Sequence, residues 1–176
     1  MAELFLIGQL KGGIGFSQPE LSCKYSLVLG EAWKVVDGET EANTQVDEGL
    51  PGEMCTWSCP IDVHLTTESV NDWPKLVFEV WSRDRFGRND LAGYGVCNIP
   101  YNVGNHQLKV HCWKPVGNAL ERLTELFVGG SVVLKRPEII LNSDDREDLV
   151  TRPTGVIELE LNVLANGFEA VDGIER

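Results

Sequence analysis

Hydrophobic and polar residues alternate along most of this chain, which is the pattern of half-buried β-strands. From Ile157 to Val163 every second residue is apolar, and the residues between them are Glu or Asn. Alternation or a short apolar run predicts further strands at residues 4–10, 22–29, 57–65, 76–81, 94–99 and 107–113, with weaker candidates at 33–36 and 139–141. Glycine and proline separate these short segments, so the sequence predicts an antiparallel sandwich or barrel.

One segment, residues 119–128, has helical periodicity instead. Asn118 is suited to the N-cap and Glu121 to the third helical position, an arrangement that forms a capping box. The apolar stripe of this helix consists of Leu120, Leu123 and Phe127. Gly129 and Gly130 follow as stop signals, so the sequence predicts a short helix before the last strands.

Composition narrows the class of protein. The chain has 176 residues, about one domain's length, and no change of composition marks a second domain. With 15 basic and 27 acidic residues its net charge is −12, which makes nucleic acid an unlikely main partner. The sequence has no long apolar run or signal peptide, and its five cysteines are widely spaced. We therefore expect a soluble intracellular protein without disulfides.

Motifs for catalysis or cofactor binding are weak. The glycine-rich residues 11–16 (KGGIGF) lack the Lys and hydroxyl of a phosphate-binding loop, so we expect a tight hairpin turn. Cys55, Cys59 and His64 could suggest zinc, but no second ligand pair is near, which favours buried thiols and a surface imidazole. No nucleophile elbow or Cys–His pattern occurs. We expect neither an enzyme nor a cofactor.

The most informative segment is residues 80–95, VWSRDRFGRNDLAGYG, which predicts a strand, a charged loop and a second strand. Asp84 and Asp90 on this loop are oxygen ligands of the kind that calcium takes, six to eight per ion. The tip of the loop is basic and aromatic, and its residues are candidate contacts with a partner or membrane: Arg83, Arg85, Phe86 and Arg88. The alternative is a solvated loop whose Phe86 folds back on the sandwich.

This segment resembles the third calcium loop of C2 domains. Ser82 stands at the first Asp position of that loop, and Asp84 and Asp90 match the second and third. The matching first loop, residues 21–25 (LSCKY), has no carboxylate and places Lys24 in the way. The resemblance implies the C2-like fold and a degenerate calcium loop, with no metal bound.

A closer resemblance runs from Ala2 to about Phe168. Its motifs are F-x-x-x-x-L-x-C-K-Y at 16–25, A-W-K at 32–34, T-Q-V-D at 44–47, W-S-x-P-I-D at 57–62, W-P-K-L at 73–76, F-G-R-x-x-L-A-G-Y-G at 86–95 and F-V-G-G at 127–130. In this order they resemble the B9-domain family. The resemblance implies an all-β, C2-like antiparallel sandwich with one short inserted helix, a single domain over residues 1–168 and a C-terminal tail over 169–176.

The same resemblance implies a function. Members of this family are non-enzymatic scaffolds of the Meckel-syndrome (MKS) complex at the ciliary transition zone and basal body, on the cytoplasmic side, where they support cilium assembly and the membrane-protein diffusion barrier. The implied partners are B9 domain-containing protein 1 and the Meckel syndrome type 1 protein. The alternative is a peripheral phospholipid-binding C2 module, calcium-dependent or not, which the net charge of −12 and the few calcium ligands disfavour.

Overall fold

The structure is a computed structural model, and it describes residues 1–117 and 150–168. Its strands are β1 (Ala2–Ile14), β2 (Glu20–Val28), β3 (Trp33–Gly38), β4 (Glu41–Asn43), β5 (Asp47–Glu48), β6 (Cys55–Thr67), β7 (Lys75–Arg83), β8 (Asn89–Asn98), β9 (Gly104–Pro115) and β10 (Thr151–Asn166). The predicted helix at 119–128 and the weak strand candidate at 139–141 lie outside the described residues. Within the described ranges no helix has the length and apolar character needed to cross a membrane.

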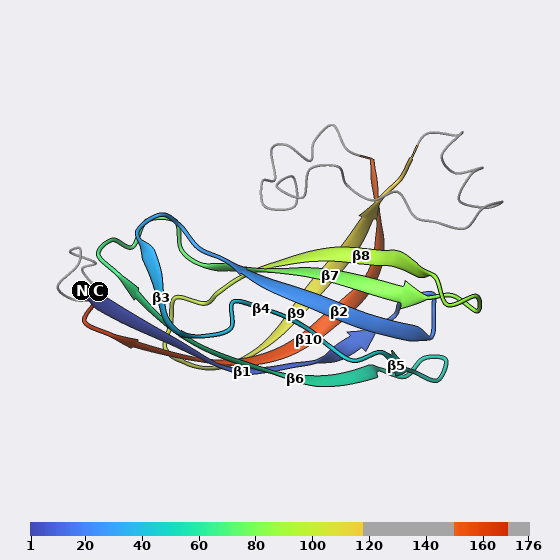
Figure 1. The fold of residues 1–176 in the computed structure, drawn as a ribbon, viewed down its shortest axis with the longest axis horizontal. Coiled ribbons are helices and arrows are strands. Elements are labelled where there is room, and N and C mark those ends of the chain that lie inside the picture. The colour runs from blue at the N-terminus through green and yellow to red at the C-terminus, as the bar shows by residue number, and fades with distance from the viewer. Residues whose placement is uncertain (118–149, 169–176) are drawn as a thin grey trace.

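The strands form one antiparallel sheet that folds over itself into two layers. The order is β3-β6-β1-β10-β9-β8-β7-β2-β4, and β5 pairs with β2. In Figure 1, β8, β7 and β2 lie above β1, β6 and β10. The change of layer occurs between β8 and β9, where the ladder consists of a single pair, Tyr94 with Trp113. The predicted all-β antiparallel sandwich is confirmed.

The core lies between the two layers and is built by the alternation seen in the sequence. In β10 every second residue from Ile157 to Val163 is buried, and β1, β6 and β7 contribute their alternate positions in the same way. Two side chains also connect the layers by hydrogen bonds. The indole Nε1 of Trp57 in β6 donates to the carbonyl of Leu21 in β2 at 3.1 Å, and the hydroxyl of Tyr25 donates to the Pro60 carbonyl at 3.3 Å.

The prediction of a tight hairpin at residues 11–16 is wrong. Residues 11–14 continue β1, which pairs with β6 and β10, whereas β2 pairs with β7, β4 and β5 in the other layer. Gly12 and Gly13 follow a β-bulge after Leu10 and allow close packing, because a Cβ on Gly13 would lie 2.8 Å from the indole ring of Trp57. Only Gly15, with φ of +81°, serves the change of direction.

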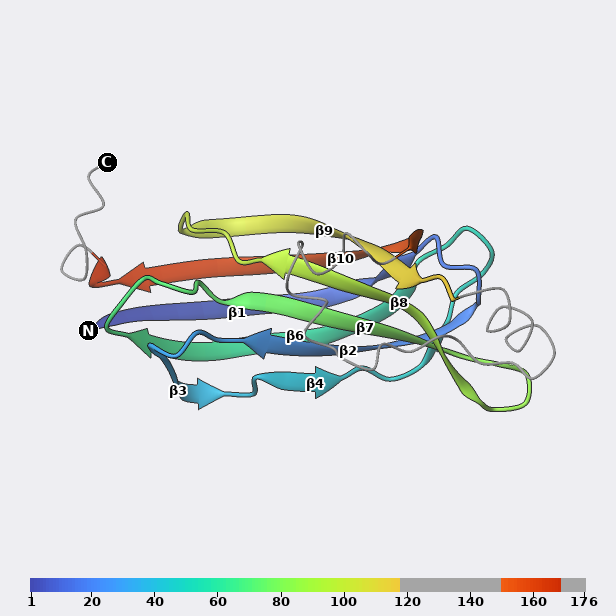
Figure 2. The same ribbon diagram turned by 90° about the horizontal axis from the view of Figure 1, so that it is seen from above.

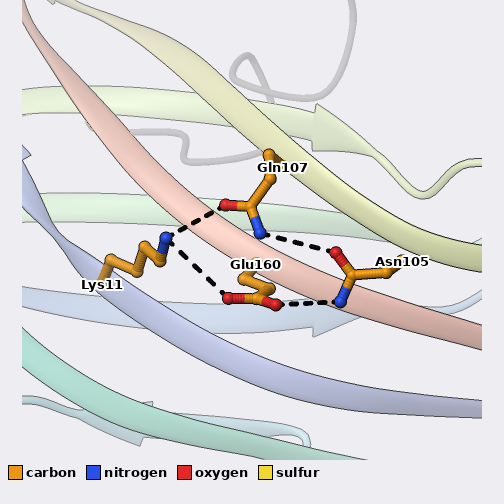
Figure 3. A network of polar contacts seen from close by, with 4 residues as sticks. All are labelled: Lys11, Asn105, Gln107 and Glu160. Carbon is orange, nitrogen blue, oxygen red and sulfur yellow. Dashed lines mark hydrogen bonds and ion pairs between the residues drawn. The ribbon is translucent and has the colours of Figure 1, made fainter.

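The outer faces of the two layers differ in character. On β1, β9 and β10, four polar side chains form a closed network (Figure 3). Lys11 Nζ donates to Gln107 at 3.1 Å and lies 3.8 Å from Glu160, Asn105 donates to Glu160 at 2.9 Å, and Gln107 donates to Asn105 at 3.4 Å. The part of the outer face that this network covers is therefore polar, with its hydrogen bonds formed within the chain.

The outer face of β7, β8 and β9 carries a second, smaller hydrophobic cluster. Leu91 and Tyr94 of β8 are buried there, with four partly buried apolar residues packed against them: Val77, Trp81, Val96 and Trp113. Tyr94 and Trp113 have ring centroids 5.6 Å apart. An apolar outer face beside the β8–β9 pair is a feature that the sequence analysis did not predict.

Candidate functional site

Three connections gather at one end of the sandwich, opposite the end where the N-terminus lies. They are the β1–β2 turn, the β5–β6 loop and the β7–β8 loop, and Figures 1 and 2 both show them at the same end. Loops at one end of a rigid sandwich are common positions for binding residues. The β7–β8 loop carries the contact residues that the sequence singled out.

Asp84 organises the β7–β8 loop. One of its carboxylate oxygens, Oδ1, accepts hydrogen bonds from the backbone N–H groups of Phe86 at 2.8 Å and Arg88 at 2.9 Å. The other, Oδ2, accepts from the Arg88 guanidinium, with Nε and Nη2 each at 2.8 Å. Backbone hydrogen bonds from Asp84 N–H to the Arg88 carbonyl and from Gly87 N–H to the Asp84 carbonyl, both 2.9 Å, close the turn. The loop therefore has a defined shape.

The tip of this loop presents an aromatic ring between two cations. The guanidinium carbons of Arg85 and Arg88 lie 5.0 and 5.4 Å from the centre of the Phe86 ring, within the range of a cation–π contact. The Phe86 side chain is nevertheless 70% exposed. The structure therefore does not show the alternative in which Phe86 folds back on the sandwich.

The oxygen atoms of this loop do not form a calcium-binding site. The hydrogen bond from the Arg88 backbone, followed by the Arg88 side chain and the Phe86 N–H, lowers the pKa of Asp84, and both its carboxylate oxygens are already engaged. The Ser82 hydroxyl is directed at the main chain, donating to the Asp90 carbonyl at 3.1 Å. Calcium needs several more oxygens than this loop supplies. The hydrogen bonds of Asp84 within the loop instead fix the conformation of the loop.

The segment that was matched to the first calcium loop is not a loop. Residues 21–25 lie inside β2, where Leu21, Cys23 and Tyr25 point into the core. Lys24 points outward and pairs with Glu41 of the neighbouring strand β4 at 3.3 Å. The interpretation that Lys24 stands in the way in a first calcium loop is therefore wrong, because this stretch is part of β2 and Lys24 pairs with the neighbouring strand.

Two of the three possible zinc ligands, Cys55 and His64, have other partners within the protein. Cys55 is buried, its thiol donates to the Pro19 carbonyl at 3.2 Å, and burial raises the pKa of that thiol. His64 stacks on Phe5 with ring centroids 4.1 Å apart and faces Glu3 at 3.6 Å. In residues 1–117 and 150–168 no group of three or more His, Cys, Asp or Glu is arranged to hold a metal.

A pocket that sequence reasoning missed lies at the same end, between the β1–β2 turn and the β5–β6 loop. Its volume is about 390 Å³, and its apolar lining includes Ile14, Phe16, Pro19, Leu21, Leu50 and Pro51. Leu50 at its mouth is 66% exposed. The Leu-Pro-Gly run at residues 50–52 could have indicated an apolar residue on a turn, but the sequence alone does not show that it faces residues 14–21.

Comparisons with known proteins agree on one family. The sequence model of the B9-C2 family, described as "Ciliary basal body-associated, B9 protein", matches residues 4–164. B9 domain-containing protein 2 of Homo sapiens is 44% identical over 169 residues, covering 96% of this chain and 97% of that protein. The Drosophila melanogaster protein of the same name is 34% identical over 170 residues, covering 96% of both chains.

Two more distant similarities were found. B9 domain-containing protein 1 of Xenopus laevis is 27% identical over 153 residues, covering 85% of this chain and 77% of that protein. Among solved structures, the C2A domain of plant Extended Synaptotagmin 1 aligns over 95% of both chains with a TM-score of 0.46 and 12% identity.

Proposed function

Because this chain belongs to the B9-C2 family of ciliary basal body-associated proteins, we propose that it is a non-enzymatic scaffold subunit of the MKS complex. In this proposal residues 1–168 are its single B9 domain and residues 169–176 a tail. It acts on the cytoplasmic side of the ciliary transition zone, where it supports cilium assembly and the membrane-protein diffusion barrier. Its partners are B9 domain-containing protein 1 and the Meckel syndrome type 1 protein. The match to a B9 domain-containing protein 1 supports a family of related subunits.

The observation that carries the proposal is the shape of the β7–β8 loop. A large apolar ring that is 70% exposed, beside two guanidinium groups, has the composition of a protein-interface anchor. The bonds of Asp84 fix the backbone of the loop that carries this ring before any partner arrives. A preformed anchor loses little conformational entropy on binding, which favours a stable contact.

The four candidate contact residues of the β7–β8 loop have different roles in this proposal. Phe86 is exposed, and Arg85 beside it forms no ion pair among the described residues. These two are therefore the contact residues in this proposal. Arg88 is bound to Asp84 by its guanidinium and acts by positioning the loop. Arg83, the exposed last residue of β7, lies at the base of the loop and adds positive charge there.

The test is co-expression with B9 domain-containing protein 1 and the Meckel syndrome type 1 protein from the same organism. Light scattering after gel filtration should give a single species at the summed mass, and separate species would contradict direct assembly. Phe86→Ala combined with Arg85→Glu should weaken the assembly at least tenfold, since exposed aromatic and Arg anchors dominate interface energies. Tyr101→Ala is the matched control, because Tyr101 is also 70% exposed but lies away from this loop.

A second candidate function is weak binding to anionic membranes. The exposed Phe86 between Arg85 and Arg88 is suited to insert beside anionic headgroups. Since both oxygens of Asp84 are engaged within the loop, this contact would be independent of calcium. Sedimentation with phosphatidylserine vesicles, in calcium and in EDTA, tests it: equal binding that Phe86→Ala abolishes supports it, and no binding in either condition removes it.

A further inference from the structure

The apolar pocket at the loop end has fixed walls. On one side, Gly49 N–H donates to the Pro19 carbonyl at 3.0 Å, which ties the β5–β6 loop to the β1–β2 turn. On the floor, the buried thiol of Cys55 donates to the same carbonyl at 3.2 Å. Glu53 N–H donates to the Leu50 carbonyl at 2.8 Å and closes the turn at the mouth. The pocket is therefore formed by the chain itself and needs no ligand to shape it.

The rim of the pocket is acidic. Glu53 lines it directly, and Glu20 and Glu48 stand opposite each other in the register between β2 and β5, next to the lining residues Pro19 and Gly49. Like charges in directly opposed positions destabilise a sheet. Among the ion pairs of residues 1–117 and 150–168, none involves these three glutamates. Glu53 is the one charged side chain among the described residues that line the pocket, and Glu20 and Glu48 add negative charge beside it. Lys114 and Arg152 line a neighbouring pocket that shares Gly15, Ser17 and Gln18 with this one, so the excess negative charge is confined to the side formed by β5 and the β5–β6 loop.

An apolar pocket with an acidic rim favours a ligand that is both apolar and positively charged. The volume of about 390 Å³ is large enough for one or two big side chains, and the exposed Leu50 extends the apolar surface outward. Anionic lipid headgroups and acidic peptides would be repelled by Glu20, Glu48 and Glu53. Cations placed beside an apolar side chain would be attracted.

We propose that this pocket binds a segment of a partner protein in which a large apolar side chain is flanked by Arg or Lys. The apolar side chain enters between Leu21 and Leu50, and the flanking cations lie against the glutamate rim. The site is separate from the β7–β8 loop, so it adds a second point of attachment beyond the proposed function. It does not depend on which complex the protein joins.

The test uses ¹⁵N NMR of the full chain with the capped pentapeptide Gly-Arg-Phe-Arg-Gly as the probe. Titration to about 5 mM suits a contact of this small size, which is expected near the millimolar range. Backbone amide shifts should concentrate in residues 14–21 and 49–55. The peptides Gly-Glu-Phe-Glu-Gly and Gly-Arg-Ala-Arg-Gly should bind at least threefold more weakly, since each lacks one of the two required features.

Glu53→Lys should weaken binding of the Arg-Phe-Arg peptide at least threefold, because it replaces an attraction at the rim by a repulsion. Glu68→Lys makes the same charge change at the end of β6, away from the loop end, and should leave binding unchanged. Absence of shifts at 5 mM, equal binding of the acidic peptide, or equal affinity of Glu53→Lys would each overturn the proposal.

A further outcome concerns a second copy of this chain as the occupant, since Arg85 and Phe86 share the chemistry of the probe. Shifts at the pocket that depend on protein concentration without peptide, and that Phe86→Ala removes, would assign the pocket to self-association and overturn the partner assignment. Failure of the co-expression test leaves the NMR result intact, so the two proposals fail separately.

Discussion

Trp57→Phe should destabilise the protein far more than the same change at Trp73. Trp57 is 1% exposed, lies over Gly13 and carries the indole hydrogen bond that joins β6 to β2 across the core. Removing a buried hydrogen bond contributes about 1 kcal/mol to the loss. Replacing the indole by a phenyl ring leaves roughly 40 Å³ unfilled, which at ~24 cal/mol per Å³ adds about 1 kcal/mol. The expected loss in the free energy of unfolding is therefore ~2 kcal/mol.

Trp73 offers a matched control for this calculation. Its indole also donates to a backbone carbonyl, that of Ile99 at 3.0 Å, and it packs edge-on against Trp33. Trp73 is only partly buried, so water can replace the lost donor and no closed cavity forms. We expect Trp73→Phe to lose less than about 1 kcal/mol.

The assay is urea unfolding followed by far-ultraviolet circular dichroism, which does not depend on the tryptophans as probes. With a slope of about 2 kcal/mol per molar urea, Trp57→Phe should lower the midpoint by ~1 M at an unchanged slope. Equal shifts for the two variants, or a shift below ~0.25 M for Trp57→Phe, would refute the reasoning that this indole connects the layers.

Three further predictions concern the loop and the titrating groups. Asp84→Ala should speed hydrogen exchange at the amides of Phe86 and Arg88 at least tenfold, with β7 amides as the internal control; unchanged rates would show that Asp84 does not shape the loop. Burial raises the pKa of Cys97 to about 11 and that of Cys112 to about 12, so the folded state retains thiol protons that the unfolded state loses above pH 9. Stability should therefore fall as the pH rises from about 9 toward 12, and Cys97→Ser with Cys112→Ala should flatten that fall in urea midpoints. The hydrogen bond from Asn105, then the nearby amide of Gln107 and the charge of Lys11, lower the pKa of Glu160. The contribution of Glu160 to stability is therefore present above its unfolded pKa and is lost as the pH falls through the folded value. Glu160→Gln should reduce the acid sensitivity of the midpoint, and an unchanged acid limb would contradict this.

Strand positions could be predicted from the sequence wherever one face of the strand is buried and the other is exposed to solvent. The segments at 76–81, 107–113 and 157–163 fall inside β7, β9 and β10, because period-two burial leaves a direct signal in the residue types. The short strands β4 and β5 left no such signal, since three and two residues cannot show a period. The segment 11–16 misled because glycine marks both turns and close packing, and only the position of Trp57 distinguishes the two.

The candidate site was predictable in composition and not in geometry. Sequence showed a loop with Arg85, Phe86 and Asp84, but not that Asp84 uses both oxygens on its own loop, because that depends on the turn conformation. It assigned Arg88 as a contact residue, while the structure binds its guanidinium to Asp84. The apolar pocket lies between two segments, residues 13–21 and 49–55, that are far apart in the chain, a proximity that no local pattern encodes.

The position of β1 in the sheet has a consequence for how the chain is made. β1 pairs with β6 on one side and with β10, which comes much later in the chain, on the other. One full edge of β1 must therefore stay without its partner until β10 has been synthesised. Such non-local pairing is slow, and the unpaired N–H and C=O groups of an open strand edge favour wrong pairing in a growing chain. Until β10 is made, this unpaired edge can form hydrogen bonds with strands of other chains.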